Sequence, residues 1–240
     1  PKDIQFAKGT YVKKEKAVMH THYQPPIDPD MEAIEKAVEM MAEAKCPVFY
    51  TGGGVINTGP GGSKALRELV RETGFPITST LMGLGAYPAS DKQWLGMLGM
   101  HGTYEANWAM HDCDVMINIG ARFDDRVTGR IDKFSPNSKK IHFDIDVSYI
   151  NKNVMVDLPI LSDAERALKA MLEVWRKKGY KADQKALGQW WKRIDQWRAK
   201  NCLAYKKDDK IIKPQYALER LRYFTEKDKR ETYITTEVGQ

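Results

Sequence analysis

The stretch from Cys46 to Gly54 constrains the fold of this chain more than any other. It reads CPVFYTGGG, a short apolar run followed by three consecutive glycines. An apolar run that ends at a glycine turn before a helix is typical of a buried parallel strand. Because glycine has no Cβ, backbone N–H groups in such a turn can approach a phosphate or a ring closely. We therefore expect a strand–turn–helix unit that presents its backbone to a ligand.

The same organisation recurs along the chain. N-cap residues and helical periodicity predict helices at 30–45, 63–72, 104–111 and 164–178. Short apolar runs predict strands at 46–51, 75–81, 114–120 and 140–146. This alternation indicates a doubly wound α/β sheet, and right-handed crossovers bring its strand-end loops to one edge. In chain order, these loops read GGG, TLMGLG, LGMHG, GARFDDR and DID.

Composition limits the classes of protein and partner. The chain has 240 residues and 42% hydrophobic content, enough for a sizeable core. No apolar run approaches the roughly 18 residues of a membrane span, so no membrane partner is expected. Cys46, Cys113 and Cys202 lie too far apart for a CxxC motif or a disulfide framework. This usage favours a reducing, cytosol-like compartment.

The positive charge is concentrated in one segment. Residues 175–210 contain twelve Lys or Arg and four Asp, a charge of +8, against +6 for the whole chain. A basic segment with Trp190, Trp191 and Trp197 is compatible with nucleic-acid binding. It equally fits a helical linker whose Trp residues pack on the parent domain, and large aromatic side chains favour that second interpretation. We therefore expect no nucleic-acid partner.

The glycine turn does not match the dinucleotide fingerprint. Gly52 and Gly54 supply two positions of GxGxxG, but Asn57 stands where the third glycine belongs. A standard NAD site is therefore disfavoured, although so many glycine loops still suit a long ligand with phosphates.

Charged residues in the later loops allow two interpretations. Arg122 and Arg126 suit a pyrophosphate, and Asp144 or Asp146 suits ribose or adenine. The alternative is an Arg–carboxylate network that holds the loops, and both interpretations stay open at this point.

Residues suited to catalysis are harder to find. His101 lies between glycines, in a setting that suits a ligand contact, and no nucleophile stands in an elbow motif. His20 and His22 are spaced like two metal ligands, but no third ligand follows nearby. We expect a binding domain without a metal site.

The loop motifs carry a family resemblance. YTGGGVINTGP, LMGLGAYPASD, GMHGTYEANWAMHDCD, IGARFDDRVTGR and HFDIDVSYINKN together resemble the catalytic large subunits of acetolactate synthase (acetohydroxyacid synthase), a thiamine-diphosphate-dependent family. Glyoxylate carboligase and pyruvate oxidase are more distant relatives of the same architecture. The resemblance runs along nearly the whole chain.

The resemblance implies a domain organisation. Residues 1–27 would be the end of a pyrimidine-binding domain and a linker, and 28–180 a central FAD-binding domain with a six-stranded parallel Rossmann-like sheet. Residues 181–212 would form a basic helical linker, and 213–240 the start of a diphosphate-binding domain. The chain would then be a piece of a longer, cytoplasmic or organellar enzyme.

The resemblance also implies an activity. The parent enzyme would condense pyruvate with pyruvate or 2-ketobutyrate and release CO2 in branched-chain amino-acid biosynthesis. Thiamine diphosphate and Mg²⁺ would belong to the intact parent, which would be a homodimer or higher oligomer with a possible small regulatory subunit. No catalytic residue would lie in this chain, so alone it would bind FAD without catalysing. An alternative is a non-catalytic nucleotide-binding or assembly module.

Site residues follow from the same motifs. The FAD-binding set would be Gly52, Gly53, Gly54, Thr80, Leu81, Met82, Leu98, Gly99, Met100, His101, Gly120, Arg122, Asp124, Arg126, Val127, Asp144, Ile145, Asp146, Ser162, Asp163 and Ala164. Ser162 replaces a glycine found in many members. Met100, Asp125 and Arg126 match the substrate channel where herbicides bind. Val238, Gly239 and Gln240 match the beginning of the thiamine diphosphate contacts.

Overall fold

The computed structural model describes residues 6–10, 27–228 and 230–235, and it has one six-stranded parallel sheet. The strands are β1 (Pro47–Thr51), β2 (Ile77–Ser79), β3 (Trp94–Met97), β4 (Val115–Ile119), β5 (Lys139–Asp144) and β6 (Leu158–Leu161). Their order is β3-β2-β1-β4-β5-β6. This is a doubly wound sheet with its topological switch point between β1 and β4. The expected fold class and strand number are confirmed.

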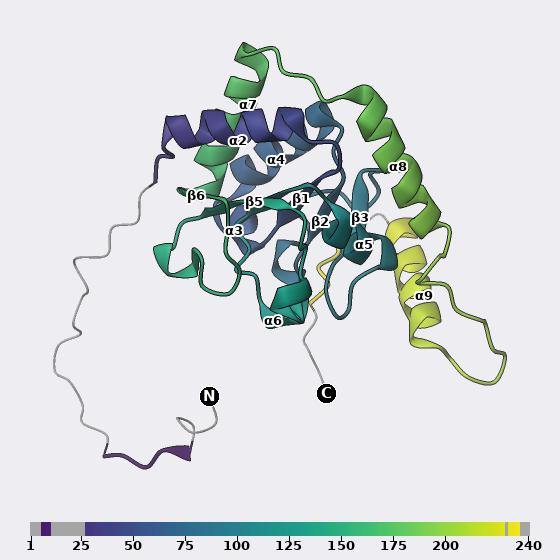
Figure 1. Ribbon diagram of the computed structural model, residues 1–240. Coiled ribbons are helices and arrows are strands. Elements are labelled where there is room, and N and C mark those ends of the chain that lie inside the picture. The colour runs from purple at the N-terminus through teal and green to yellow at the C-terminus, as the bar shows by residue number, and fades with distance from the viewer. Residues whose placement is uncertain (1–5, 11–26, 229, 236–240) are drawn as a thin grey trace.

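Two helical layers cover the sheet. The longer helices are α2 (Met31–Glu43), α4 (Pro60–Thr73), α5 (Tyr104–Asp112), α7 (Ala164–Lys177), α8 (Gln184–Arg198) and α9 (Pro214–Lys227). Short α3 (Gly53–Asn57) and α6 (Asp125–Thr128) follow β1 and β4, and the 3₁₀ turns are η1 (Leu81–Gly83), η2 (Ile131–Lys133) and η3 (Val147–Tyr149). Helices α2, α4 and α7 lie together over one face, and α7 packs against the other two (Figure 1). The chain passes from β1 through β2 to β3 in one direction along the sheet and then returns from β3 to β4 in the other direction. Because such crossover connections are right-handed, α5, which connects β3 to β4, lies on the other face.

All four predicted helices form, and one of them begins earlier than predicted. Asp30 caps α2 by accepting a hydrogen bond from the Glu32 N–H at 3.0 Å. Helix α4 ends at Gly74, which has a left-handed φ of 75° that glycine adopts without strain. The prediction for this helix began too late, because Pro60 fits the first helical turn, where its missing N–H costs nothing.

The sequence pattern missed the two edge strands. These are β3 (Trp94–Met97) and β6 (Leu158–Leu161), neither of which is among the four predicted strands. The predicted LGMHG loop directly follows β3, because it begins at Leu98.

Helix α8 is the central part of the basic segment. Trp190 is 1% exposed, and its Nε1 donates to the carbonyl oxygen of Pro47 at 3.0 Å. Trp191 Nε1 donates to the carbonyl oxygen of Gly74 at 3.0 Å, and Trp197 stacks on Trp108 with ring centroids 6.2 Å apart. The expectation that these Trp side chains pack on the parent domain is confirmed.

Candidate functional site

Six loops meet at the carboxyl edge of the sheet, because all six strands are parallel. Ligands of open α/β sheets bind outside this edge, at the switch point. Every predicted site residue that the structure describes lies in one of these loops or directly beside it, Asp144 being the last residue of β5. Five inter-strand intervals of about 4.8 Å give the edge a width of about 24 Å, the scale of an extended dinucleotide.

The glycine turn after β1 packs against the turn after β4. The Gly52 N–H donates to the Ile119 carbonyl at 3.0 Å, and the Gly54 N–H donates to the Gly120 carbonyl at 3.1 Å. A Cβ on Gly52 would lie 2.2 Å from the Gly120 oxygen, and a Cβ on Gly54 would lie 2.7 Å from Gly120 Cα. Two of the three glycines are therefore required by contact between backbones. Gly53 is less confined, since its Cβ would meet Met82 Cβ at 3.2 Å.

Apolar side chains stand exposed on the β2 and β3 side of the edge. Leu81 is 51% exposed, Met82 73% and Met100 65%. Thr80 caps η1 by accepting from the Gly83 N–H at 3.2 Å, and this capped turn presents Leu81 and Met82. Such a concentration of apolar surface at a strand-end edge marks a site for an apolar group.

The loop after β3 is fixed from two sides. Gly99 donates through its N–H to Asn107 Oδ1 at 2.8 Å and accepts from Asn107 Nδ2 at 3.0 Å. The Met100 N–H donates to the Arg126 carbonyl at 2.9 Å. The structure thus brings Met100 next to Arg126, which directly follows Asp125 in the chain. His101 is exposed in the same loop, whereas Leu98 is buried.

Arginines dominate the loop after β4. Arg122 pairs with Asp124 at 3.0 Å, and its guanidinium lies 5.5 Å from the centre of the Tyr149 ring. The Arg122 side chain remains 57% exposed. Asp124 also caps α6 by accepting from the Arg126 N–H at 3.4 Å. The Arg–carboxylate network, one of the two interpretations of these residues, is therefore present in part, and the Arg122 guanidinium remains open to solvent.

Acidic residues follow β5 and β6. Buried Asp144 accepts from the Asp146 N–H at 2.9 Å, and Asp146 caps η3 by accepting from the Ser148 N–H at 2.9 Å. Asp163 caps α7 and accepts from the Thr58 hydroxyl at 2.6 Å, so its carboxylate is committed to the fold. Ile145, between Asp144 at the end of β5 and Asp146 in the following loop, is 42% exposed.

Ser162 has an unpaired hydroxyl. It is 1% exposed, and its Oγ has no hydrogen-bond partner within the described residues. Leaving a buried hydroxyl unpaired costs about 1–3 kcal/mol, so a ligand atom there would relieve the cost. Ala164, in the first turn of α7, is buried and offers only its backbone.

Sequence reasoning missed three polar residues beneath the β4 loop. Tyr50, Asn118 and His142 are adjacent partners in the β1–β4–β5 register, so they share one face of the sheet. All three are 0% exposed. The available signal was a polar side chain inside a mostly apolar strand, because most buried polar groups form hydrogen bonds. Asn118 and His142 do so, whereas the Tyr50 hydroxyl has no partner within the described residues.

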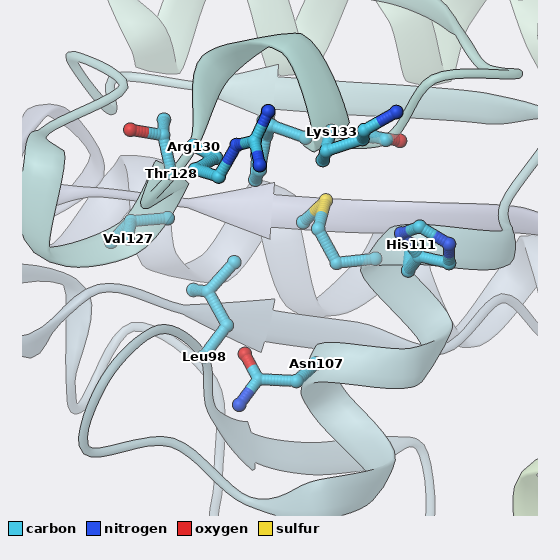
Figure 2. Close-up of a pocket in the computed structure, with 10 residues that line it drawn as sticks. Leu98, Asn107, His111, Val127, Thr128, Arg130 and Lys133 are labelled. Atoms are coloured by element: carbon cyan, nitrogen blue, oxygen red, sulfur yellow. The ribbon is translucent and has the colours of Figure 1, made fainter.

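A separate hollow of about 200 Å³ lies between α5 and residues 127–135 (Figure 2). It is lined by Leu98, Asn107, Met110, His111, Val127, Thr128, Arg130, Lys133, Phe134 and Ser135. Only Leu98 and Val127 belong to the predicted FAD set. The hollow therefore shares two residues with the predicted site but does not coincide with it.

Some predicted positions fall outside the described residues, namely Val238, Gly239, Gln240, His20 and His22. Within the described ranges, no group of three or more His, Cys, Asp or Glu side chains is arranged to hold a metal ion. Within the same ranges, no helix combines the length and apolar character needed to cross a membrane.

Comparison with known proteins gives a consistent result. Residues 34–171 match the family described as "Thiamine pyrophosphate enzyme, central domain". The chain is 44% identical to the acetolactate synthase large subunit of Haemophilus influenzae, over 91% of this chain and 37% of that protein. It is 42% identical to the acetolactate synthase isozyme 3 large subunit of Escherichia coli, over 100% of this chain and 41% of that protein. It is 37% identical to the chloroplastic acetolactate synthase 2 of Brassica napus, over 100% of this chain and 36% of that protein. The chain thus spans about two fifths of the length of these relatives.

Proposed function

This chain belongs to the thiamine pyrophosphate enzymes, whose central domain its residues 34–171 match, and from that premise we propose that it is the FAD-binding part of an acetolactate synthase catalytic large subunit. The whole protein would condense pyruvate with a second pyruvate or with 2-ketobutyrate and release CO2. It would use thiamine diphosphate and Mg²⁺, assemble as a homodimer or higher oligomer, and associate with a small regulatory subunit.

One observation carries the FAD proposal, namely the chemical order of the side chains along the carboxyl edge. The strand order puts exposed Leu81, Met82 and Met100 on the β2 and β3 side. The glycine turn of β1 and exposed Arg122 of β4 come next, and the acidic β5 loop follows. FAD has the same sequence of chemistry, from an apolar ring system through a diphosphate to a polar adenosine.

Further details of the site fit this ligand. The Arg122 guanidinium, open to solvent, suits the diphosphate as a charge-assisted donor. The unpaired Ser162 hydroxyl lies near the acidic end, because the Ser162 N–H donates to the Asp144 carbonyl at 3.1 Å. The residues present would therefore hold each part of the cofactor.

The role of this domain would be to bind and orient. The condensation has no net redox change, since reactants and products are at the same overall oxidation level, so bound FAD would supply a wall of the site and no net electron transfer. Met100, Asp125 and Arg126 would line the adjacent channel, and the bridge between Met100 and Arg126 would hold that lining in place.

Titration with FAD tests the proposal. The 240-residue chain should quench FAD fluorescence on binding, and Arg122→Ala should weaken the affinity about tenfold through loss of a charge-assisted contact. Arg130→Ala is the matched control, because Arg130 also pairs with an Asp two residues on (Asp132, 2.6 Å) and is 77% exposed. Equal affinity of the Arg122→Ala and Arg130→Ala variants would remove Arg122 from the site.

A second measurement addresses activity. With pyruvate, thiamine diphosphate and Mg²⁺, the chain alone should form no acetolactate in a colorimetric assay, because no catalytic residue is assigned to it. Acetolactate formation by the purified chain would contradict this division of roles.

A further inference from the structure

The β4 loop, defined as residues 120–124, has its backbone held by three side chains. Asn118 Nδ2 donates to the Ala121 carbonyl at 2.7 Å, and Asn118 Oδ1 accepts from the Ala121 N–H at 3.1 Å. His142 Nε2 lies 3.0 Å from the same carbonyl oxygen. From the other side, Asn153 Nδ2 donates to the Phe123 carbonyl at 3.0 Å. We propose that Asn118, His142 and Asn153 are positioning residues that present Arg122 to the ligand, an inference that rests on the proposed FAD site.

The sheet register explains why two side chains converge on one oxygen. Asn118 and His142 are direct partners on adjacent strands β4 and β5, so they project from the same face. Both are 0% exposed, which removes water as a competing partner. Because the Ala121 oxygen is an acceptor, His142 must carry its proton on Nε2. Its buried Nδ1 has no hydrogen-bond partner within the described residues.

The conformation of the loop requires such support. Phe123 has a φ of 53°, a left-handed value that costs about 1–2 kcal/mol for a residue with a side chain. Its ring is buried beside Tyr50 and His142, with centroid distances of 5.9 and 5.0 Å. Arg122 and Asp124 precede and follow Phe123 in the chain, and their side chains are 57% and 42% exposed. The clamp on Ala121 and the inserted ring together determine where Arg122 emerges.

The test compares two substitutions at His142. His142→Gln keeps an N–H donor at a similar distance from the backbone, whereas His142→Met keeps similar volume without a donor. Trypsin needs an extended, accessible segment, so we expect slow cleavage after Arg122 while the β4 loop keeps its fixed conformation. Without FAD, His142→Met should be cleaved there about tenfold faster than the unmodified chain, and His142→Gln within about threefold of it. Cleavage after Lys178, at the end of α7, should not change in either variant.

Affinity for FAD gives the second readout. His142→Met should weaken FAD binding about tenfold, and His142→Gln should restore most of it. Equal loss of stability in both variants, with the tryptic rate at Arg122 unchanged, would show a merely structural role and overturn the inference. An unmodified chain that binds no FAD would overturn the proposed function, while the tryptic comparison would still decide the clamp.

Asn153→Ala keeps the test decisive should His142→Met fail to fold. Asn153 is an exposed residue, so its truncation leaves the core intact. Loss of its one hydrogen bond to the Phe123 carbonyl should accelerate cleavage after Arg122 about fivefold. A cleavage rate equal to that of the unmodified chain would overturn the role of Asn153.

Discussion

The main-chain N–H of Met100 donates a 2.9 Å hydrogen bond to the carbonyl oxygen of Arg126. Met100 follows edge strand β3, and Arg126 follows β4, two strands beyond β2 in the sheet. The loop after β3 therefore reaches across the ends of β2 and β1. This bridge joins the apolar and cationic parts of the proposed site into one wall.

Gly99→Ala should break this bridge. Gly99 has a φ of 91°, and a Cβ there would lie 2.5 Å from the Arg126 carbonyl oxygen. Strain and overpacking together should lower the free energy of unfolding by about 3 kcal/mol and weaken FAD binding. Gly85→Ala is the matched control, because Gly85 has a φ of 93° with nothing within 4 Å of the added Cβ. Urea denaturation of both variants separates the backbone strain, which both share, from the clash with Arg126, which only Gly99→Ala has. Equal destabilisation of the two variants would show that the bridge contributes nothing to stability.

Trp190→Ala should destabilise the domain strongly. The side chain is 1% exposed and its Nε1 donates to the Pro47 carbonyl at the start of β1. Its removal leaves a large cavity and should cost about 3–5 kcal/mol, measured by thermal or urea unfolding. Gln189→Ala, on the exposed side of the same helix, should change stability by less than about 0.5 kcal/mol. A small effect at Trp190 would mean that α8 unfolds separately from the sheet.

The central strands were predictable because each lies in a mostly apolar stretch that leads into a glycine-rich or charged loop, and the edge strands were not. Strand β3 contains Gly96 at a φ of 91° and pairs irregularly with β2. Strand β6 contains Pro159, which has no N–H to donate and is tolerated on an edge strand. Both edge strands are partly exposed, so they lack the continuous burial of β1 and β4.

Site prediction had a similar limit. Loop motifs located the carboxyl edge, since glycines and charges are visible in a sequence. The support beneath the loops was not predictable, because Asn118 and His142 meet only through the register of two strands that are separated along the chain. The glycine turn also has a structural role that the sequence did not reveal, since Gly52 and Gly54 fit against Gly120.

Stability should depend on pH through Asp91. Partial burial alone would raise the pKa of the Asp91 carboxyl, but hydrogen bonds from the Gln93 N–H (3.0 Å) and Arg71 (3.4 Å) outweigh it and hold the pKa below the ordinary value of 3.8. A lowered folded-state pKa gives stability that is present above the unfolded-state value and is lost as the pH falls through the folded-state value. Asp91→Asn should therefore cost about 1 kcal/mol at pH 7, and the difference should shrink as the pH falls below about 4. A difference that stays constant down to pH 2 in urea titrations would contradict this.

The three thiols should react in a fixed order. Burial raises the pKa of the Cys113 thiol to about 12, and its Sγ lies 3.4 Å from Ser135 Oγ. Cys202 is exposed and Cys46 is partly buried. Because the thiolate is the reactive form, a disulfide reagent at pH 8 should modify Cys202 first and Cys113 only upon unfolding. Mass spectrometry of partly labelled protein checks this order, Cys202→Ser should remove the fast phase, and early labelling of Cys113 would contradict the burial.

Substitutions in the glycine turn should separate its structural role from its ligand role. Gly54→Ala places a Cβ 2.7 Å from Gly120 Cα, between two backbones that are hydrogen-bonded to each other. Neither backbone can move without disturbing the β1–β4 pair, so we expect a loss of about 2–3 kcal/mol in the free energy of unfolding.

Gly53→Ala should behave differently, because its Cβ would meet the flexible Met82 side chain at 3.2 Å. Met82 is 73% exposed and can move aside, so the free energy of unfolding should fall by less than about 1 kcal/mol. The added methyl would nevertheless enter the space between the turn and η1, where the proposed cofactor passes. Gly53→Ala should therefore weaken FAD binding about tenfold while the fold is retained, a contact loss of about 1.4 kcal/mol. Full FAD affinity in a stably folded Gly53→Ala variant would place the ligand away from this turn.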